Sequence, residues 1–223
     1  MTKMIELLDS AIDAHGGLWG VKGHAGILAD VGYEAQAHAQ RATLLRFGAP
    51  DRKVQFTPDR LELQEASGQF IEARDNPRSD FIGHRAETPW DLLHVGYFSC
   101  YALWTYLTQP FLYASPGFIC EEIEPWHENG ETWRRLKVVF SDSIASHTRE
   151  QITYFGADGL MRRHDYTVEV LGGSNAAHYI DSYQDFDGFK YPTRRRVYRR
   201  ADDGRPMPEP LLVGIDVRAL RFS

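Results

Sequence analysis

Cysteine is scarce in this chain, and the common signatures of cofactor chemistry are missing. Only Cys100 and Cys120 occur among 223 residues, and neither belongs to a CxxC pair or to a Cys/His spacing typical of zinc sites. The sequence also contains no GxSxG, P-loop or GxGxxG motif, which removes local support for a nucleophilic serine and for nucleotide or flavin chemistry. We therefore expect no disulfide framework, no zinc centre and no cofactor.

Long apolar runs are absent as well. No run approaches the ~20 apolar residues that a membrane-spanning helix needs, so we expect no membrane span. Residues 1–17 carry Glu6, Asp9 and Asp13 and lack the uninterrupted apolar stretch and small-residue cleavage site of a secretory signal. Together with the unpaired cysteines, these features predict a cytoplasmic protein whose two thiols stay free.

Positive charge is not in excess, because the formal net charge is −6. Basic residues do gather in RRRVYRR (194–200), but on a strand they alternate, with Arg195, Val197 and Arg199 on one face. Cationic stems of this kind commonly cover the solvated face of a sheet. The acidic segment 120–131 likewise lacks the ligand spacing of a zinc or calcium site. We expect neither a nucleic acid nor a metal ion as a partner.

The apolar pattern divides the chain into a short helix, a block of strands, a second helix and a longer block of strands. Helical spacing predicts a first helix over residues 2–14. Short extended runs separated by turn residues follow between residues 31 and 74. Six further strands are predicted at 132–140, 147–155, 160–170, 176–186, 189–200 and 210–220. Turn sequences such as GADG separate them, which favours one antiparallel sheet, long enough to curl, with helices on one side.

The segment between the two blocks, residues 87–113, holds four Tyr, two Trp and two Phe around one histidine. Thr88 followed by Pro89 gives a favourable helix start, and Pro110 ends the helix. One helical face carries the large side chains Trp90, Leu93, Tyr97, Tyr101 and Trp104, with His94 beside them. This pattern predicts a helix that packs its aromatic face against the sheet.

Two motifs resemble the LolA/LolB-like proteins of bacteria: Ala14-His15-Gly16-Gly17 after the first helix, and Asp187-Gly188-Phe189-Lys190-Tyr191-Pro192-Thr193 near the end. The resemblance covers most of the chain. It implies an α+β fold with a single strongly curved antiparallel sheet, an unclosed half-barrel, whose concave side is plugged by helices around an apolar cavity. It also implies one domain over residues 1–223, with a helical plug insertion at about 86–113.

The hairpin around GADG (156–159) indicates which side chains line such a cavity. If GADG is a four-residue loop, Phe155 pairs with Leu160 and Gln151 pairs with His164. Gln151, His164 and Tyr166 then share one face, which is the kind of convergent polar set that orients a ligand in an apolar pocket.

The opposite face of that hairpin carries Glu150, Arg163 and Asp165, whose mixed charges suit a solvated sheet surface. A change of register by one residue would exchange the two faces.

Two functional classes fit a cavity with these walls. The preferred one is a pocket protein for a hydrophobic or amphipathic small molecule, with cofactor-free acid–base chemistry of the isomerase, cyclase or hydratase type as its extension. The alternative is a non-catalytic carrier of a lipid-like or aromatic ligand. The residues that we expect to act are His164, Tyr166 and His94 in catalysis, and Trp90, Tyr97, Tyr101, Trp104, Gln151, His147 and His178 in ligand binding.

Overall fold

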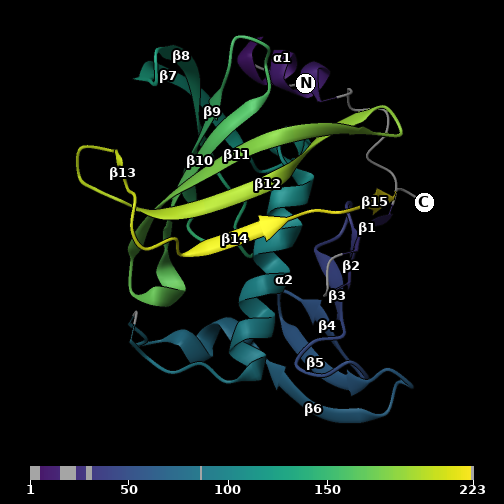
Figure 1. Ribbon diagram of the computed structural model, residues 1–223. Coiled ribbons are helices and arrows are strands. Elements are labelled where there is room, and N and C mark those ends of the chain that lie inside the picture. The colour runs from purple at the N-terminus through teal and green to yellow at the C-terminus, as the bar shows by residue number, and fades with distance from the viewer. Residues whose placement is uncertain (1–5, 16–23, 29–31, 86, 222–223) are drawn as a thin grey trace.

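The computed structural model describes residues 6–15, 24–28, 32–85 and 87–221. Its strands form two antiparallel sheets (Figure 1). The first sheet contains β1 (His24–Leu28), β2 (Gly32–Gln36), β3 (Arg41–Leu45), β4 (Arg52–Thr57), β5 (Arg60–Glu65), β6 (Phe70–Asp75) and β15 (Leu220–Arg221). The second contains β7 (Ile119–Glu128), β8 (Glu131–Val139), β9 (Glu150–Phe155), β10 (Met161–Val168), β11 (Ser174–Phe186), β12 (Phe189–Arg200), β13 (Pro206–Met207) and β14 (Val213–Asp216).

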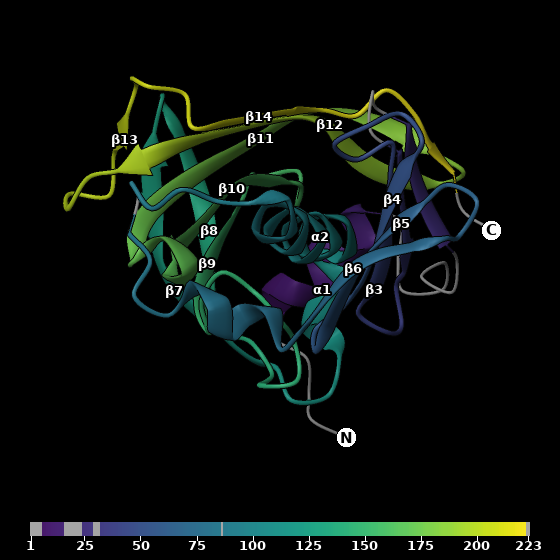
Figure 2. The ribbon, with the colours of Figure 1, turned by 90° about the horizontal axis from the view of Figure 1, so that it is seen from below.

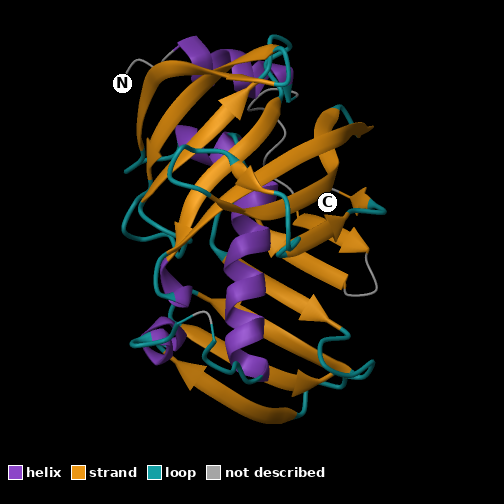
Figure 3. Ribbon diagram, turned by 60° about the vertical axis from the view of Figure 1, so that its left-hand side comes forward, coloured by secondary structure: helices purple, strands orange, loops and turns teal. Residues whose placement is uncertain are grey.

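The helices are α1 (Glu6–Ala14) and α2 (Leu92–Thr108), with short 3-10 turns η2 (Pro77–Phe81), η3 (Phe111–Ala114) and η4 (Glu169–Leu171). Seen end-on, α2 has strands on three sides (Figure 2), and its axis lies parallel to the long direction of the molecule (Figure 3). This arrangement confirms the predicted α+β class with a curved, unclosed antiparallel half-barrel around helices. The division of the ladder into two hydrogen-bonded sheets is a detail that the strand pattern alone does not give.

The first helix is α1, which overlaps the predicted helix at residues 2–14. The residues before Glu6 lie outside the described residues, and so do Gly16 and Gly17 of the motif that follows this helix. Leu7, Leu8, Ala11 and Ile12 are its buried side chains. Their spacing places them on one helical face, so α1 contributes a single apolar side to the core.

The start of α2 differs from the prediction. The helix is capped by Asp91, whose Oδ1 accepts the backbone N–H of His94 at 2.8 Å, and the N–H of Asp91 donates in return to His94 Nδ1 at 3.2 Å. The hydroxyl of Thr88 instead accepts the N–H of Arg85 at 2.9 Å. A reciprocal capping pair satisfies two helix-terminal donors, so the helix starts three residues later than Thr88 predicts. Its end before Pro110 is confirmed.

Helix α2 lies very close to the first sheet. A Cβ on Gly96 would stand 3.3 Å from Leu61 and 3.5 Å from Val54, so glycine at this position permits the approach. Trp104 is buried, and its indole N–H donates to the carbonyl of Gln36 in β2 at 2.9 Å. Alternate residues of β3 and β5 are buried, as expected for a sheet with one face covered. This side of α2 is a closed core.

The hairpin between β9 and β10 has a different register from the predicted one. Phe155 pairs with Met161, and a bulge then brings Thr153 opposite His164. Relative to the predicted register, the turn shifts the pairing by one residue and the bulge shifts it by one more, so the total shift beyond the bulge is two residues. An even shift leaves each side chain on its face, so His164 and Tyr166 keep their predicted inward face, and Gln151 is buried with them.

The outer face of β10 corrects a second prediction, because it is not solvated. Arg163 and Asp165 are buried and form a bidentate ion pair, with N···O distances of 2.6 and 2.8 Å. Glu128 of β7 also pairs with Arg163 at 3.0 Å, and the carbonyl of Gly204 accepts a further N–H. Segments distant in sequence therefore cover this face, and buried charges of this kind need such partners.

Candidate functional site

A groove of about 610 Å³ lies between α2 and the second sheet. Phe98, Ser99, Ala102 and Leu103 form its helix side, together with Trp90. Its sheet side includes Val168, Ala176, Val197, Val213 and Ile215. Tyr106 and Tyr166 are its two aromatic hydroxyl groups. Phe98, Ala102 and Tyr106 recur every four residues, so one face of α2 presents them together. The groove is thus a mostly apolar trough with phenol groups in its wall.

The strands of the second sheet build the site in two rows. In the first row Tyr166, Ala176 and Arg199 are cross-strand neighbours on β10, β11 and β12. In the next row His164, His178 and Val197 are neighbours in the same way. Since residues two apart on a strand share a face, both rows face α2. The first row borders the groove, whereas His164 and His178 are fully buried behind it.

Four buried side chains form a continuous chain of hydrogen bonds beside the groove, which we call the tyrosine–histidine chain: Tyr101, His147, Tyr106 and Tyr166. The hydroxyl of Tyr101 lies 3.1 Å from His147 Nδ1, and that of Tyr106 lies 2.7 Å from His147 Nε2. The hydroxyls of Tyr106 and Tyr166 are 2.8 Å apart. The imidazole of His147 also stacks on the Tyr166 ring, with centroids 4.0 Å apart. This packing fixes the ring positions at the groove wall.

Burial keeps the groups of this chain uncharged. Desolvation, with a smaller contribution from Arg78, lowers the pKa of His147 from 6.5 to about 3. Desolvation likewise raises the pKa of Tyr106 and of Tyr166. At neutral pH the imidazole is therefore neutral and the phenols are protonated.

A second group of polar side chains lies next to the Tyr106 ring, and we call it the inner polar cluster: Gln109, His164, His178 and Arg195. His164 Nε2 is 2.6 Å from the amide oxygen of Gln151 and 3.3 Å from the amide nitrogen of Gln109. The His178 ring stands edge-on to Tyr106, with centroids 4.5 Å apart. Burial lowers the pKa of both imidazoles well below 6.5, and the charge of Arg195 adds to this effect.

Arg195 is the most unusual member of the inner polar cluster, because only 3% of its surface is exposed. One guanidinium nitrogen donates to the carbonyl of Tyr106 at 2.8 Å, and the guanidinium carbon lies 5.4 Å from the centroid of that tyrosine ring. Burial lowers its pKa, although an arginine side chain stays charged at neutral pH. The prediction that residues of RRRVYRR on this face cover a solvated surface is therefore wrong for Arg195.

The structure brings most of the predicted site residues together. His164, Tyr166, Gln151, His147 and His178 gather around Tyr106, and Tyr101 joins them through His147.

The remaining four predicted residues lie in four different places. Trp90 lines the groove, whereas Trp104 packs on the first sheet and Tyr97 borders a separate polar depression beside Arg78. His94 lies away from the cluster, since it caps α2 and contacts Phe81, with ring centroids 4.8 Å apart.

Sequence reasoning missed three members of the site: Tyr106, Gln109 and Arg195. Tyr106 belongs to the second apolar stripe of α2, with Phe98 and Ala102, and that spacing was available as a signal. Arg195 shares a strand face with Val197, an apolar residue within the basic run, which was a weaker signal that the face is buried.

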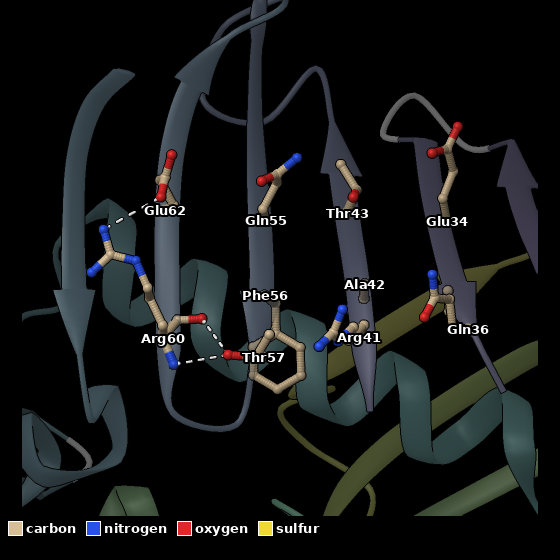
Figure 4. Close-up of a pocket in the computed structure, with 11 residues that line it drawn as sticks. Glu34, Gln36, Arg41, Ala42, Thr43, Gln55, Phe56, Thr57, Arg60 and Glu62 are labelled. Atoms are coloured by element: carbon tan, nitrogen blue, oxygen red, sulfur yellow. Dashed lines mark hydrogen bonds and ion pairs between the residues drawn. The ribbon is translucent and has the colours of Figure 1, made fainter. Parts of the chain in front are cut away.

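The outer face of the first sheet carries a shallow depression of different character (Figure 4). Glu34, Gln55, Thr57, Arg60 and Glu62 project from it, on the side of the sheet away from α2. Arg60 pairs with Glu62 at 3.4 Å, and its backbone N–H donates to Thr57 at 3.1 Å. These polar groups satisfy one another in an exposed position, so this surface is a weaker candidate than the groove.

The described ranges contain neither a cluster of metal ligands nor a membrane-spanning helix. Within those ranges, no three His, Cys, Asp or Glu side chains are placed to hold a metal ion. No helix in the described part of the chain is both long and apolar enough to span a membrane. Both cysteines are free thiols, as predicted.

Comparison with solved structures decides the fold. The structure matches a LolA superfamily protein from Nitrosomonas europaea with a TM-score of 0.55 and 6% sequence identity, over 96% of this chain and 92% of that one. The chain has a LolA-like fold. A domain assigned to outer membrane lipoprotein sorting from Vibrio parahaemolyticus matches the LolA-like fold of this chain with a TM-score of 0.53 and 10% identity, over 98% and 91% of the two chains.

A DUF1329 family protein from Desulfovibrio piger also shares the LolA-like fold, with a TM-score of 0.52 and 11% identity, over 97% of this chain and 92% of that one. No protein-family model matches the sequence, and no curated protein matches it. The predicted resemblance is therefore confirmed at the level of the fold.

Proposed function

We propose that this protein binds a hydrophobic or amphipathic small molecule in the groove between α2 and the second sheet. The observation that carries the proposal is the groove itself, with a volume of about 610 Å³. Pockets for small molecules commonly measure roughly 300–1,000 Å³ and combine apolar walls with a few polar groups. Trp90, Phe98 and Val197 represent the walls, and Tyr106 and Tyr166 supply the hydroxyls.

Affinity in such a groove comes mainly from apolar surface that leaves water. Burial contributes about 25 cal/mol per Å². If the ligand and the groove wall together bury on the order of a few hundred Å² of apolar surface, the complex gains several kcal/mol before the cost of association. The similarity to the lipoprotein-sorting domain supports the proposal at the level of the fold. We also propose that the protein acts in the cytoplasm, in keeping with its free thiols.

A second candidate is cofactor-free acid–base catalysis, and the tyrosine–histidine chain is the observation that favours it. Efficient proton transfer needs groups whose pKa lies near the working pH. The pKa of His147 is lowered to about 3, and burial raises the pKa of Tyr166. Both pKa values are displaced away from neutrality, so the geometry supports binding better than catalysis.

The experiment is a titration with Nile red, an uncharged apolar dye, against two variants of the same helix. Ser99→Phe places a large side chain in the groove, whereas Val95→Phe changes an exposed residue one turn earlier that is not part of the wall. We expect Ser99→Phe to weaken dye binding at least about tenfold, because its ring occupies ligand space. Val95→Phe should leave binding unchanged.

Two outcomes would contradict the proposal. One is the absence of saturable dye binding to the wild type. The other is equal binding by both variants, which would place the dye elsewhere on the molecule. Circular dichroism and thermal unfolding of each variant show whether a loss of binding reflects a loss of fold.

A further inference from the structure

The inner polar cluster contains donors and acceptors without partners among the described residues. They are Arg195 Nη1, both ring nitrogens of His178, His164 Nδ1 and Gln109 Oε1. None of them is reached by solvent. Buried polar atoms are nearly always hydrogen-bonded. Five unsatisfied polar atoms in one place therefore indicate that a hydrogen-bonding partner is missing. The chemistry of that partner can be inferred from the cluster.

The charge of the cluster defines the partner. Arg195 is buried, and no carboxylate in the described parts of the chain forms an ion pair with it. The imidazoles of His164 and His178 are neutral, since burial lowers their pKa. The cluster therefore holds one uncompensated positive charge, and a buried charge is strongly destabilising until it is paired. An anion with one negative charge balances it.

The position of the cluster links this anion to the groove. Tyr106 connects the two places, because it lines the groove while the guanidinium carbon of Arg195 lies 5.4 Å from its ring centroid and a guanidinium nitrogen donates to its carbonyl. The hydroxyl of Tyr106 also lies 2.8 Å from that of Tyr166, a second groove residue. The groove and the inner polar cluster therefore meet at Tyr106, and a head group bound at this end of the groove lies within range of the positive charge of Arg195.

We propose that the groove binds an amphiphile with a single carboxylate, such as a fatty acid, with the carboxylate directed to Tyr106, Tyr166 and Arg195 and the apolar body lying along Phe98 and Val197. This inference rests on the proposed function, since it uses the same groove. A guanidinium group matches the geometry of a carboxylate, and charge-assisted hydrogen bonds are stronger than neutral ones. A phosphate monoester carries up to two negative charges, whereas the inner polar cluster supplies one buried positive charge, since Arg199 at the groove wall is exposed.

Three ligands that share one chain test the head group: dodecanoate, dodecanol and dodecyl phosphate. Each is titrated at pH 7.5 with the wild type, Arg195→Met and Arg194→Met, at concentrations below the micelle concentration of the two anions and below the solubility limit of dodecanol. Arg194 precedes Arg195 on β12 and is exposed, so it gives the matched control. The measured quantity is the ratio of the dissociation constants of dodecanol and dodecanoate, which does not depend on the fraction of folded protein.

We expect dodecanoate to bind the wild type about 10- to 100-fold more tightly than dodecanol, because a hydrogen bond to a charged group is worth more than a neutral one. Arg195→Met should bring the two ligands to nearly equal affinity, whereas Arg194→Met should keep the wild-type ratio. If Arg195→Met does not fold, Arg195→Gln replaces it, since its neutral amide removes the charge and keeps hydrogen-bond donors inside the cluster.

The outcomes separate this inference from the proposed function. Equal binding of dodecanoate and dodecanol to the wild type overturns the inference and leaves the apolar groove in place; ordered water then satisfies the cluster. Tighter binding of dodecyl phosphate than of dodecanoate overturns the choice of a carboxylate. No binding of any of the three, together with no binding of Nile red, overturns the proposed function itself.

Discussion

The two sides of α2 differ in what they meet. Towards the first sheet, Gly96 allows a close approach and Trp104 is buried with its N–H satisfied. Towards the second sheet, Ala102 and Tyr106 border a groove of about 610 Å³, with an unsatisfied polar cluster behind it. One helix thus forms part of the core on one side and the wall of a groove on the other. The close packing of α2 on the first sheet therefore fixes the helix, and with it the side chains that border the groove.

The largest effect that we expect from this asymmetry is acid sensitivity. His147, His164 and His178 lie on the groove side, and His15 is buried near α1. Burial lowers the pKa of His15 to about 4 and that of His147 to about 3, and it lowers the pKa of the other two well below 6.5. Below pH 6.5 the unfolded chain therefore binds protons that the folded chain does not bind, so stability is full above that pH and falls with acid.

Each such histidine removes up to about 1.4 kcal/mol of unfolding free energy per pH unit between pH 6.5 and its folded pKa. Urea unfolding at pH 7.5, 6.0 and 5.0 should show a loss of several kcal/mol in total. His178 has no hydrogen bond from its ring, so His178→Phe should reduce the slope of this loss of stability with pH. A stability that is flat between pH 7.5 and 5.0 would contradict the buried neutral state.

A matched pair of leucines on α2 tests the asymmetry of packing. Leu93 is 2% exposed and lies on the stripe of Tyr97 and Trp104, whereas Leu103 borders the groove. Leu93→Ala should cost about 2–5 kcal/mol of unfolding free energy, as in a closed core. Leu103→Ala should cost about 1 kcal/mol or less, because the residue has open space on one side. Urea denaturation measures both, and equal losses would show that the groove is packed like the core.

Two tyrosine variants should differ less in unfolding free energy than the two leucine variants do. The hydroxyl of Tyr106 bonds both His147 and Tyr166, so Tyr106→Phe leaves two buried groups short of a partner and should cost about 1–3 kcal/mol. The hydroxyl of Tyr33 donates at 2.7 Å to a carbonyl of α2, that of Cys100. Tyr33→Phe should cost about 0.5–1.5 kcal/mol. Urea denaturation measures the unfolding free energy of both variants. A greater loss of stability in Tyr33→Phe than in Tyr106→Phe would argue against a cooperative tyrosine–histidine chain.

The smallest effect should come from the outer face of the first sheet. Arg60 and Glu62 form an exposed ion pair there (Figure 4), and exposed pairs contribute little to stability. Arg60→Ala should change neither the unfolding midpoint nor the affinity for Nile red. Impaired dye binding in this variant would point to the outer depression as a ligand site.

The sequence predicted the parts of the fold that depend on local pattern. Residues 87–113 gave an aromatic helix ended by Pro110, and the turn at GADG gave a hairpin that places His164 and Tyr166 on an inward face. The sequence could not predict that Asp91 caps α2, because Thr88-Pro89 is an equally favourable local start for a helix. The β-bulge near Arg163 was not predicted either, since a period-two pattern contains no signal for one additional residue.

The site itself depended on contacts between distant segments. Both stripes of α2 are rich in large apolar side chains, so periodicity alone cannot tell the packed side from the groove. Arg195 and Arg163 both look like solvated strand residues, and each is buried because another part of the chain covers it: α2 near Tyr106 in one case, the carbonyl of Gly204 in the other. Such cover is a tertiary property that composition and spacing do not contain.

The most direct measurement of the central claim uses tryptophan fluorescence to locate the ligand on one side of α2. Dodecanoate is titrated against the wild type, Trp90→Phe and Trp104→Phe, because Trp90 lines the groove and Trp104 packs on the first sheet. We predict a saturable change in emission that persists in Trp104→Phe and is largely lost in Trp90→Phe. A change that is lost in Trp104→Phe and kept in Trp90→Phe would place the ligand on the packed side and contradict the account.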